Sequence, residues 1–325
     1  MHHITRTSSR DGATRPLLAL LALFIAGLFA LVWSGLPSPR LPGGSPSTNV
    51  AENAVADGPL PPATYAIHRA ETRSALLMRA AFDRIGYDLD SVAQGYISVP
   101  RVLVGSLPPD LDRLDAMDGR KNLFLRLLLP VVLQVNEQIG ADRQRLVHLS
   151  AKLAAGTPLA AAEVGWLLAL ADTYDQPGAD PDALLKKVDV IPPSLALAQA
   201  IEESGWGTSR IARQNNALFG QFGQLGDGEW DYRQFGNLSD AVAAYAHNLN
   251  THRAYREFRE MRARMRRQSG EIDSWDLVTT LHRYSERGDG YVQTLRSIMR
   301  DNQLEAFDVA RLNGDRFATI LASND

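Results

Sequence analysis

The sequence predicts a mainly helical protein of the α+β class with one small β-hairpin lobe, preceded by a single transmembrane anchor and a flexible tether. Apolar residues recur at helical spacing through much of residues 64–305, whereas residues 221–235 alternate as a strand pair does. An unbroken apolar run fills residues 17–33. Of the 325 residues, 45% are hydrophobic and 22% are charged, which is typical of a globular chain.

Charge and cysteine content exclude several classes of function. The 34 Lys plus Arg and 37 Asp plus Glu leave a net charge of -3, so no basic field attracts nucleic acid. The absence of cysteine excludes disulfides, thiol nucleophiles, iron–sulfur clusters and cysteine zinc sites. The seven histidines form no HExxH motif. We therefore expect no metal and no cofactor, and catalysis by carboxylate, His, Ser or Tyr side chains.

Residues 17–33 would make a helix about 25 Å long, close to the thickness of a bilayer core. The charged residues before it are mostly basic: Arg6, Arg10, Asp11 and Arg15. By the positive-inside rule, this end stays in the cytoplasm and the rest of the chain crosses the membrane. The run is longer than the apolar part of a typical cleaved signal peptide. Residues 1–34 are thus expected to hold an uncleaved signal anchor, with a cleaved signal peptide as the alternative.

A tether and a helical accessory region follow the anchor. Residues 35–62 are rich in Pro, Gly and Ser and bury too little apolar surface to fold, so they predict the tether. Residues 63–190 form the accessory region. Residues 96–107 are rich in β-formers, but Pro100 favours an extended connector over a central strand. The helices expected in this region are 66–86, 118–140, 142–154 and 159–172.

The expected helix 118–140 is the most apolar of these, and Pro130 is expected to kink it. Charged and polar residues interrupt it, so it predicts the buried spine of the domain rather than a second membrane span. These residues are Arg120, Lys121, Arg126, Asn136 and Glu137.

The segment PPSLALAQAIEESG predicts a helix that starts at Pro192-Pro193-Ser194 and ends at Gly205. Glu202 and Glu203 lie in its last turn, about 100° apart, so they cannot both face the same side. The face of Glu203 otherwise carries small residues and one amide: Ala196, Gln199 and Ala200. Burial and the negative end of the helix dipole both disfavour the charged carboxylate, and a carboxyl with a raised pKa suits general acid catalysis.

The run ALAQAIEESGWGTSRIARQNNALFG resembles the signature of the glucosaminidase domain of glycoside hydrolase family 73. The chain is most similar to the Bax-type subgroup of these proteins. The resemblance covers residues 95–305. The other segments that support it are RKNLFLRLLLPVVLQVNEQI, NLNTHRAY and YSERGDGYVQTLRSIMRDNQ.

This resemblance implies a lysozyme-like helical domain that cleaves peptidoglycan glycan strands at N-acetylglucosamine linkages. The catalytic core would span residues 191–310, with residues 311–325 as a tail. Glu203 would be the catalytic acid and Glu202 a bystander. The expected location is the bacterial inner membrane, crossed once, with the catalytic domain in the periplasm and peptidoglycan as the partner. The resemblance points to no particular partner protein.

Residues 221–235 predict a β-hairpin with Gly226-Asp227-Gly228 in the turn. Alternation places Trp230 and Tyr232 on one face, and the other face carries Glu229, Asp231 and Arg233. The resemblance implies that this lobe carries a second acidic residue, which activates water or stabilises the sugar cation. Glu229 is the candidate, ahead of Asp231. The distance between the two carboxyl groups, which distinguishes a retaining from an inverting reaction, is left open.

The resemblance also implies contacts to the sugar. Tyr284 and Tyr291 flank a Gly-rich turn. Tyr284 is expected to face the cleft as a catalytic, substrate-contacting residue, and Tyr291 is a substrate-binding candidate expected mainly to pack. Burial of both tyrosines in the core is the alternative. Asn216, Phe219 and Gly220 of NNALFG would border the sugar cleft. Asn216 can hydrogen-bond an acetamido group, and the rings of Trp206 and Phe219 can stack on a pyranose. A purely structural role for Asn216 and Trp206 is the alternative.

Residues 253–267 are rich in arginine and predict an amphipathic helix with a basic, solvated face. Contact of that face with an anionic wall polymer or with lipid head groups is the alternative. Two other functions fit the same signature. One is a lytic transglycosylase, which needs only one glutamate, and the other is a wall-binding module without activity.

Overall fold

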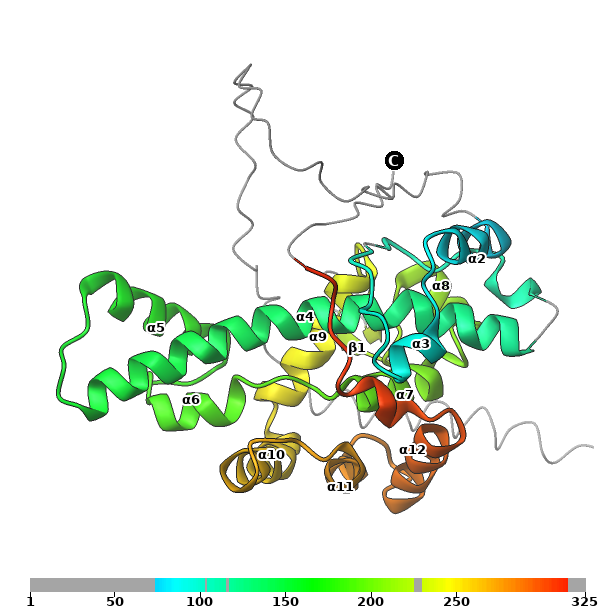
Figure 1. Ribbon diagram of the computed structural model, residues 1–325. Helices are drawn as coiled ribbons and strands as arrows, with labels where there is room; N and C mark the ends of the chain where they lie inside the picture. Colours follow the sequence, from blue (N-terminus) through cyan, green and yellow to red (C-terminus); the bar gives the residue numbers. More distant parts are fainter. Residues whose placement is uncertain (1–73, 103, 115–116, 225–229, 315–325) are drawn as a thin grey trace, which may run out of the picture. The chain divides into compact units, whose positions relative to one another are not determined.

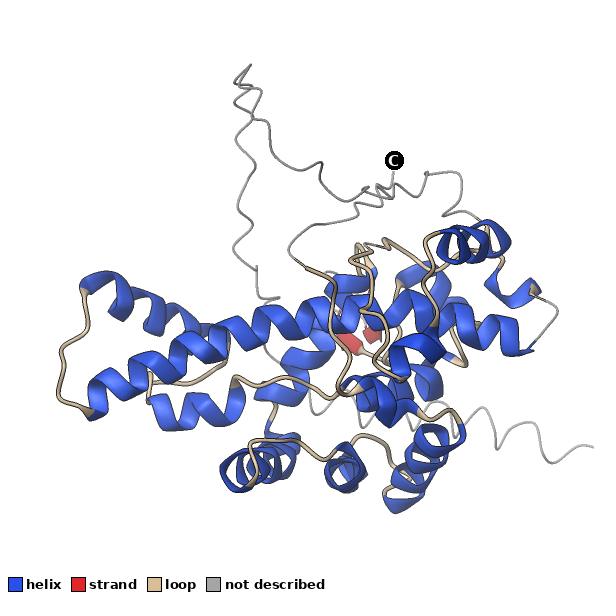
Figure 2. Ribbon diagram, in the orientation of Figure 1, coloured by secondary structure: helices blue, strands red, loops and turns tan. Residues whose placement is uncertain are grey.

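Figure 1 shows the computed structural model of the chain, in which residues 74–102, 104–114, 117–224 and 230–314 are described. The described residues are mainly helical with one two-stranded sheet (Figure 2), which confirms the predicted class. The predicted anchor and tether lie outside the described residues. The helices and strands are α2 (Ala75–Arg84), α3 (Leu89–Ala93), α4 (Met117–Ala154), α5 (Ala161–Thr173), α6 (Pro181–Lys187), α7 (Pro193–Ser204), α8 (Arg210–Asn215), β1 (Phe222–Gln224), β2 (Trp230–Tyr232), α9 (Leu238–Thr251), α10 (Arg256–Gln268), α11 (Ser274–Leu277) and α12 (Asp289–Asp301).

Helix α4 is a single helix where the sequence predicted two, 118–140 and 142–154. Gly140 and Ala141 do not interrupt it, and Pro130 lies inside it. By length and composition, α4 is the helix among the described residues that could cross a membrane, but 72% of its most apolar 18-residue stretch is buried inside the fold. This burial agrees with the predicted spine, because a core helix is covered by protein.

The structure confirms the extended connector at residues 96–107. No strand forms there within the described positions 96–102 and 104–107. A parallel bridge joins Val99 to Leu312, and the Val99 amide donates to the Arg311 carbonyl at 2.8 Å. The segment is therefore held by residues 311–313 and by contacts such as that of Gln134 with the Val102 carbonyl, rather than by a sheet.

The chain divides into two compact units. The described part of the smaller unit is the hairpin within Phe222–Arg233. Its strands are antiparallel, with Phe222 opposite Tyr232 and Gly223 opposite Asp231. The rings of Phe222 and Tyr232 meet edge to face at 5.1 Å. This confirms the predicted strand pair, while the expected turn residues lie outside the described positions.

The larger unit contains the helices and has two principal apolar clusters. The main cluster joins α2, α4, α7, α9 and α12. A smaller one lies between α5, α6 and the C-terminal half of α4, where Leu146, Leu170 and Leu184 meet (green, Figure 1). The helix that carries Glu203, α7, is the most enclosed of these elements, because its residues from Pro193 to Ile201 are all buried.

Helix α10 differs from the expectation of a solvated basic face, because two of its arginines are buried. Arg259 donates to the carbonyls of Leu249 and His252 at 3.0 and 2.9 Å. Arg262 has no exposed surface and donates to main-chain carbonyls that include those of Lys186 and Lys187. These guanidinium groups satisfy carbonyls at the C-terminal ends of α9 and α6, a role that helix periodicity does not reveal.

Candidate active site

Glu203 lies in the last turn of α7, one residue before the helix ends. The helix begins at Pro193, and Gly205 ends it in the left-handed conformation at φ 59°, both as predicted. At the first turn, the side chain of Asp308 accepts hydrogen bonds from the amide and the hydroxyl of Ser194, both at 2.8 Å. Glu203 therefore projects from a rigid, buried helix, although its own side chain is only partly buried.

A chain of hydrogen bonds leads to one oxygen of Glu203. Tyr291 donates from its hydroxyl to Glu203 Oε1 at 2.8 Å. The Gln199 side-chain amide donates to the Tyr291 hydroxyl at 3.1 Å, and the Tyr245 hydroxyl donates to Gln199 Oε1 at 2.7 Å. Gln199, Tyr245 and Tyr291 are buried. Every donor in the chain is directed toward Glu203, so the chain stabilises negative charge on Oε1.

Gly220 lies against the other oxygen of Glu203. A Cβ atom at this position would come within 2.8 Å of Glu203 Oε2, and the backbone has φ +61°. Both conditions require glycine, because a side chain would collide with the carboxyl and would strain the backbone. The last residue of the NNALFG segment therefore allows the main chain to approach the carboxyl group.

Burial raises the pKa of Glu203 to about 7. The hydrogen bond from Tyr291 opposes this increase, the neighbouring carboxylate of Glu202 adds to it, and the positive charge of Arg287 opposes it. The carboxyl group thus has a large protonated population near neutral pH. This agrees with the raised pKa that the sequence analysis predicted for the inward-facing acid.

Glu202 has a different environment from its neighbour. The guanidinium of Arg287 donates to Glu202 Oε1 at 2.6 Å, and the same guanidinium lies 5.5 Å from the centre of the Tyr291 ring. Glu202 is therefore ion-paired with Arg287, whereas Glu203 accepts a hydrogen bond from Tyr291. The two acids face different sides of the helix end, as their spacing of about 100° requires.

Both tyrosines of the YSERGDGY turn are buried, and Tyr291 rather than Tyr284 contacts Glu203. Tyr284 is only 4% exposed, and its hydroxyl donates to the carbonyl of Phe219 at 2.9 Å. Tyr291, expected mainly to pack, bonds Glu203 directly. The two rings stack in parallel at 5.6 Å. Tyr291 lies in the first turn of α12, which directs its hydroxyl to α7, and sequence spacing does not show this direction.

Phe219 and Asn216 are placed inside the fold. Phe219 is 1% exposed, and its ring stacks on Tyr245 at 4.0 Å, so it differs from the expected open platform for a sugar. Asn216 adopts the left-handed conformation at φ 53°, and its amide donates to the Phe235 carbonyl at 3.1 Å. Both residues hold the segment that ends at Gly220, which is the structural alternative considered for Asn216.

Trp206 is partly buried and has φ +60°, which is uncommon for a bulky residue. Its ring meets Phe124 edge to face at 6.0 Å, and the Lys121 ammonium lies 5.0 Å from the ring centre. Of the predicted aromatic contacts, Trp206 is the one that keeps some exposed surface beside the helix end that carries Glu203.

Glu229 lies outside the described residues. Asp231 is described, and its Oδ1 accepts from the amide of Tyr232 at 2.7 Å within the hairpin. Between residues 74 and 314, the described side chains form no group of three or more His, Asp or Glu that could hold a metal ion.

The sequence analysis did not identify Tyr245 as part of the site, and it named Gln199 only as a neighbour on the helix face. It placed Gly220 at the border of the sugar cleft, and the structure adds that this glycine lies against Glu203 Oε2. Gln199 had a signal, because an amide four residues before Glu203 on an otherwise small, apolar face needs a buried partner. Tyr245 is 46 residues from Gln199 and had no local signal.

The residues of this site lie within a segment that matches a known protein family. The family described as mannosyl-glycoprotein endo-beta-N-acetylglucosaminidase (glucosaminidase) matches residues 181–304, which include Glu203, Gly220 and Tyr291. "Protein bax" of Escherichia coli (strain K12) is 35% identical over 207 residues, which are 60% of this chain and 74% of that protein. The chain belongs to the Bax-type family of glucosaminidase-domain proteins.

Among solved structures, the catalytic domain of the autolysin Auto from Listeria monocytogenes matches this Bax-type chain at 15% identity. The match covers 49% of this chain and 95% of that domain, with a TM-score of 0.27.

Proposed function

We propose that this protein is a peptidoglycan hydrolase that cleaves glycan strands at N-acetylglucosamine linkages, with Glu203 as the general acid. The observation that carries the proposal is the environment of Glu203: a partly buried carboxyl with a pKa of about 7, held through one oxygen. Such a carboxyl can protonate the glycosidic oxygen at neutral pH. The family match supports the substrate class.

The hydrogen bonds suggest which oxygen transfers the proton. Tyr291 donates to Oε1, so Oε1 acts as an acceptor in both states of the carboxyl. The proton of the neutral acid then belongs on Oε2, the oxygen next to Gly220. Glu203 transfers its proton to the glycosidic oxygen as the bond between that oxygen and the anomeric carbon breaks. Positive charge then develops on the sugar that carries this carbon. In this proposal Glu229 supplies the second carboxylate, which activates water or stabilises that charge.

The predicted sugar contacts divide into two groups. Trp206 is proposed to contact the sugar, since its ring keeps exposed surface. Tyr284, Asn216 and Phe219 are proposed to act indirectly. The bond from Tyr284 to the Phe219 carbonyl holds the main chain just before Gly220, and so sets how closely that glycine approaches Glu203.

The experiment is digestion of purified peptidoglycan by the full-length chain, with the released fragments analysed by mass before and after borohydride reduction. Reducible N-acetylglucosamine ends are expected from the native protein, and Glu203→Gln should abolish them. Glu271→Gln, at an exposed glutamate between α10 and α11, is the matched control and should release the same fragments.

Two results contradict the proposal. Anhydro-muramyl ends from the native protein would show a lytic transglycosylase instead of a hydrolase. If the native protein released no fragment, and Glu203→Gln bound peptidoglycan as tightly as the native protein does, the protein would be a wall-binding module.

The proposed location is the bacterial inner membrane, with the catalytic domain in the periplasm. The apolar run at residues 17–33 and the arginines before it support this orientation. In a bacterial host, the full chain should stay in the membrane fraction after alkaline carbonate extraction, and protease added to spheroplasts should digest the domain. Release of intact full-length chain by carbonate would contradict the anchor.

A further inference from the structure

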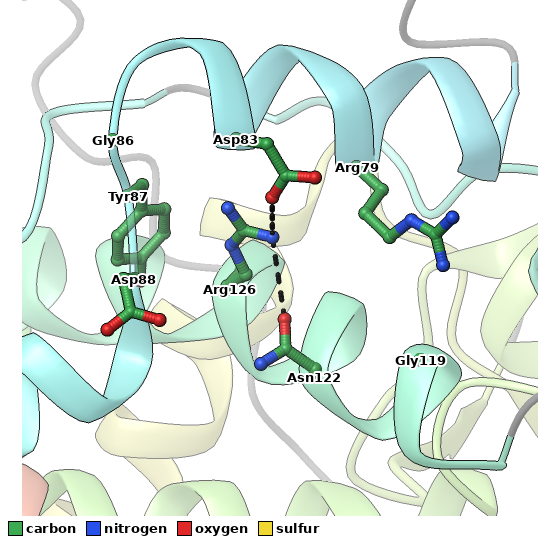
Figure 3. Close-up of a pocket in the computed structure, with 8 residues that line it drawn as sticks. All are labelled: Arg79, Asp83, Gly86, Tyr87, Asp88, Gly119, Asn122 and Arg126. Atoms are coloured by element: carbon green, nitrogen blue, oxygen red, sulfur yellow. Dashed lines mark hydrogen bonds and ion pairs between the residues drawn. The ribbon is translucent and has the colours of Figure 1, made fainter.

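A pocket of about 400 Å³ lies between α2, the start of α3 and the first turns of α4 (Figure 3). This volume is in the range of small-molecule sites. None of the lining residues belongs to the candidate active site. They are Arg79, Asp83, Gly86, Tyr87, Asp88, Gly119, Asn122 and Arg126.

Arg126 supplies a buried positive charge to this pocket. It is 5% exposed, and one guanidinium nitrogen, Nη1, bonds both Asp83 at 2.7 Å and Asn122 at 3.5 Å. Its Nε is buried and has no hydrogen-bond partner among the described residues. The guanidinium also lies within 5.6 Å of the centre of the Tyr87 ring. The Arg126 guanidinium therefore keeps hydrogen-bonding capacity that a carboxylate could use.

Two further donors line the pocket without partners. The Tyr87 hydroxyl is buried, in a residue that is 1% exposed, and bonds no described group. Arg79 extends from α2 toward the first turn of α4, beside Gly119 (Figure 3), and its side chain makes no ion pair within the described part of the chain. Together with Arg126, these groups could surround a carboxylate.

The pocket also carries negative charge. Asp83 uses Oδ1 for Arg126 and is 60% exposed at its side chain. Asp88 uses Oδ2 to cap α3 through the Ser91 amide at 2.7 Å. Both side chains line the pocket, and Asp83 keeps its Oδ2 free of described partners (Figure 3). Two arginines and two aspartates fit a ligand that carries both charges and is neutral as a whole.

We infer that this pocket binds an amino-acid group with a free ammonium and a free carboxylate on the same carbon. The carboxylate lies against Arg126 and Arg79, and the ammonium lies against Asp83 and Asp88. Such a group belongs either to a free amino acid or to the end of a longer side chain. The inference does not depend on the activity proposed for Glu203.

Calorimetric titration of the full-length protein tests this inference with four probes: alanine, alaninamide, N-acetylalanine and Nε-acetyllysine. Alanine retains both charges, alaninamide lacks the carboxylate, and N-acetylalanine lacks the ammonium. Nε-acetyllysine retains both charges at the end of a chain. We expect alanine or Nε-acetyllysine to bind at least tenfold more tightly than the two singly charged probes. Tighter binding of Nε-acetyllysine assigns the site to a chain end, and tighter binding of alanine assigns it to a free amino acid.

Two substitutions test the two sides of the pocket. Arg79→Gln removes an unpaired charge, and Asp88→Asn removes a charge while keeping an oxygen that can cap α3. Each should weaken binding of the better doubly charged probe at least fivefold. Arg264→Gln, at an exposed arginine of α10, should leave it unchanged.

Three results would overturn the inference. The first is that neither alanine nor Nε-acetyllysine binds. The second is that N-acetylalanine binds as tightly as the better doubly charged probe, which would show a plain anion site, and the third is that alaninamide does so, which would show a plain cation site. Thermal unfolding of each variant confirms that the protein is folded under the titration conditions.

Discussion

Glu203 is the residue at which burial and polar contacts compete most directly. Burial favours the neutral acid, whereas the Tyr291 hydroxyl donates to the charged form. A pKa of about 7 results from this competition. In the proposed reaction Glu203 must be protonated, and this form is lost as the pH rises through 7, so kcat/KM on peptidoglycan should fall above that pH.

Tyr291 and Glu202 both contribute to the pKa of Glu203, and removing one or the other should move the pH at which kcat/KM decreases in opposite directions. Tyr291→Phe removes a hydrogen bond to the carboxylate, so the pKa of Glu203 should rise. Glu202→Gln removes a like charge, so that pKa should decrease. The measurement is the pH dependence of kcat/KM for the three proteins. Alkaline limits that coincide in all three would show that another group controls this limit.

Gly220→Ala should reduce turnover about 100-fold, because its Cβ would lie 2.8 Å from Glu203 Oε2 and displace the carboxyl. The positive φ adds a loss of stability of about 1–2 kcal/mol. Gly156→Ala is the matched control, since Gly156 has φ +72° with no atom near its Cβ. It should lose similar stability and keep full turnover. Equal turnover of both variants would show that the contact with Glu203 is unimportant.

The two ends of helix α7 are fixed in different ways, one by a local residue and the other by a residue distant in the sequence. Its C-terminal end at Gly205 is set locally, by a residue that readily adopts positive φ. Its first turn has no side-chain cap from its own flank, since Pro192 is the N-cap residue. Asp308, from the far end of the domain, accepts from Ser194 and also from the hydroxyl of Ser274 at 2.6 Å. This distant cap connects the helix that carries Glu203 to the C-terminal segment.

Asp308→Ala should therefore lower the free energy of unfolding by about 2–3 kcal/mol, because three donors lose their acceptor. Urea unfolding followed by circular dichroism measures the loss. Asp301→Ala, at an exposed aspartate at the end of α12, should change stability by less than about 0.5 kcal/mol. If Asp308→Ala were as stable as that control, water would be an adequate cap for α7.

In the helical unit as a whole, a buried group of charges joins distant elements. Asp189 is 1% exposed and accepts from Arg266 at 3.0 Å, with Arg143 of α4 at 3.5 Å. Arg262 donates to the main-chain carbonyl of Asp189 at 3.1 Å and to the Asn250 side chain at 2.8 Å. The group thus links α4, α9 and α10 to the segment between α6 and α7. Its members depend on one another, since a buried charge is costly without its partners.

Arg262→Met should lower the free energy of unfolding by about 3–5 kcal/mol, because Asp189 loses a neighbouring positive charge and several carbonyls lose their donor. Chemical denaturation measures it, with Arg264→Met at an exposed position of the same helix as the control. A loss below about 1 kcal/mol would mean that the remaining arginines are sufficient for Asp189 and that water reaches the carbonyls.

The sequence by itself determined the helical class, the strand pair, the bounds of α7 and the place of Glu203 in its last turn. These features depend on periodicity, proline and glycine, which act over a few residues. The tertiary structure alone decided that Tyr291 rather than Tyr284 bonds Glu203, that Tyr245 joins the site, that Gly220 lies against Glu203 Oε2, and that arginines of α10 are buried. The contact between Tyr291 and Glu203 joins residues 88 positions apart. Such contacts depend on how the helices pack against one another, and local sequence patterns do not predict that packing.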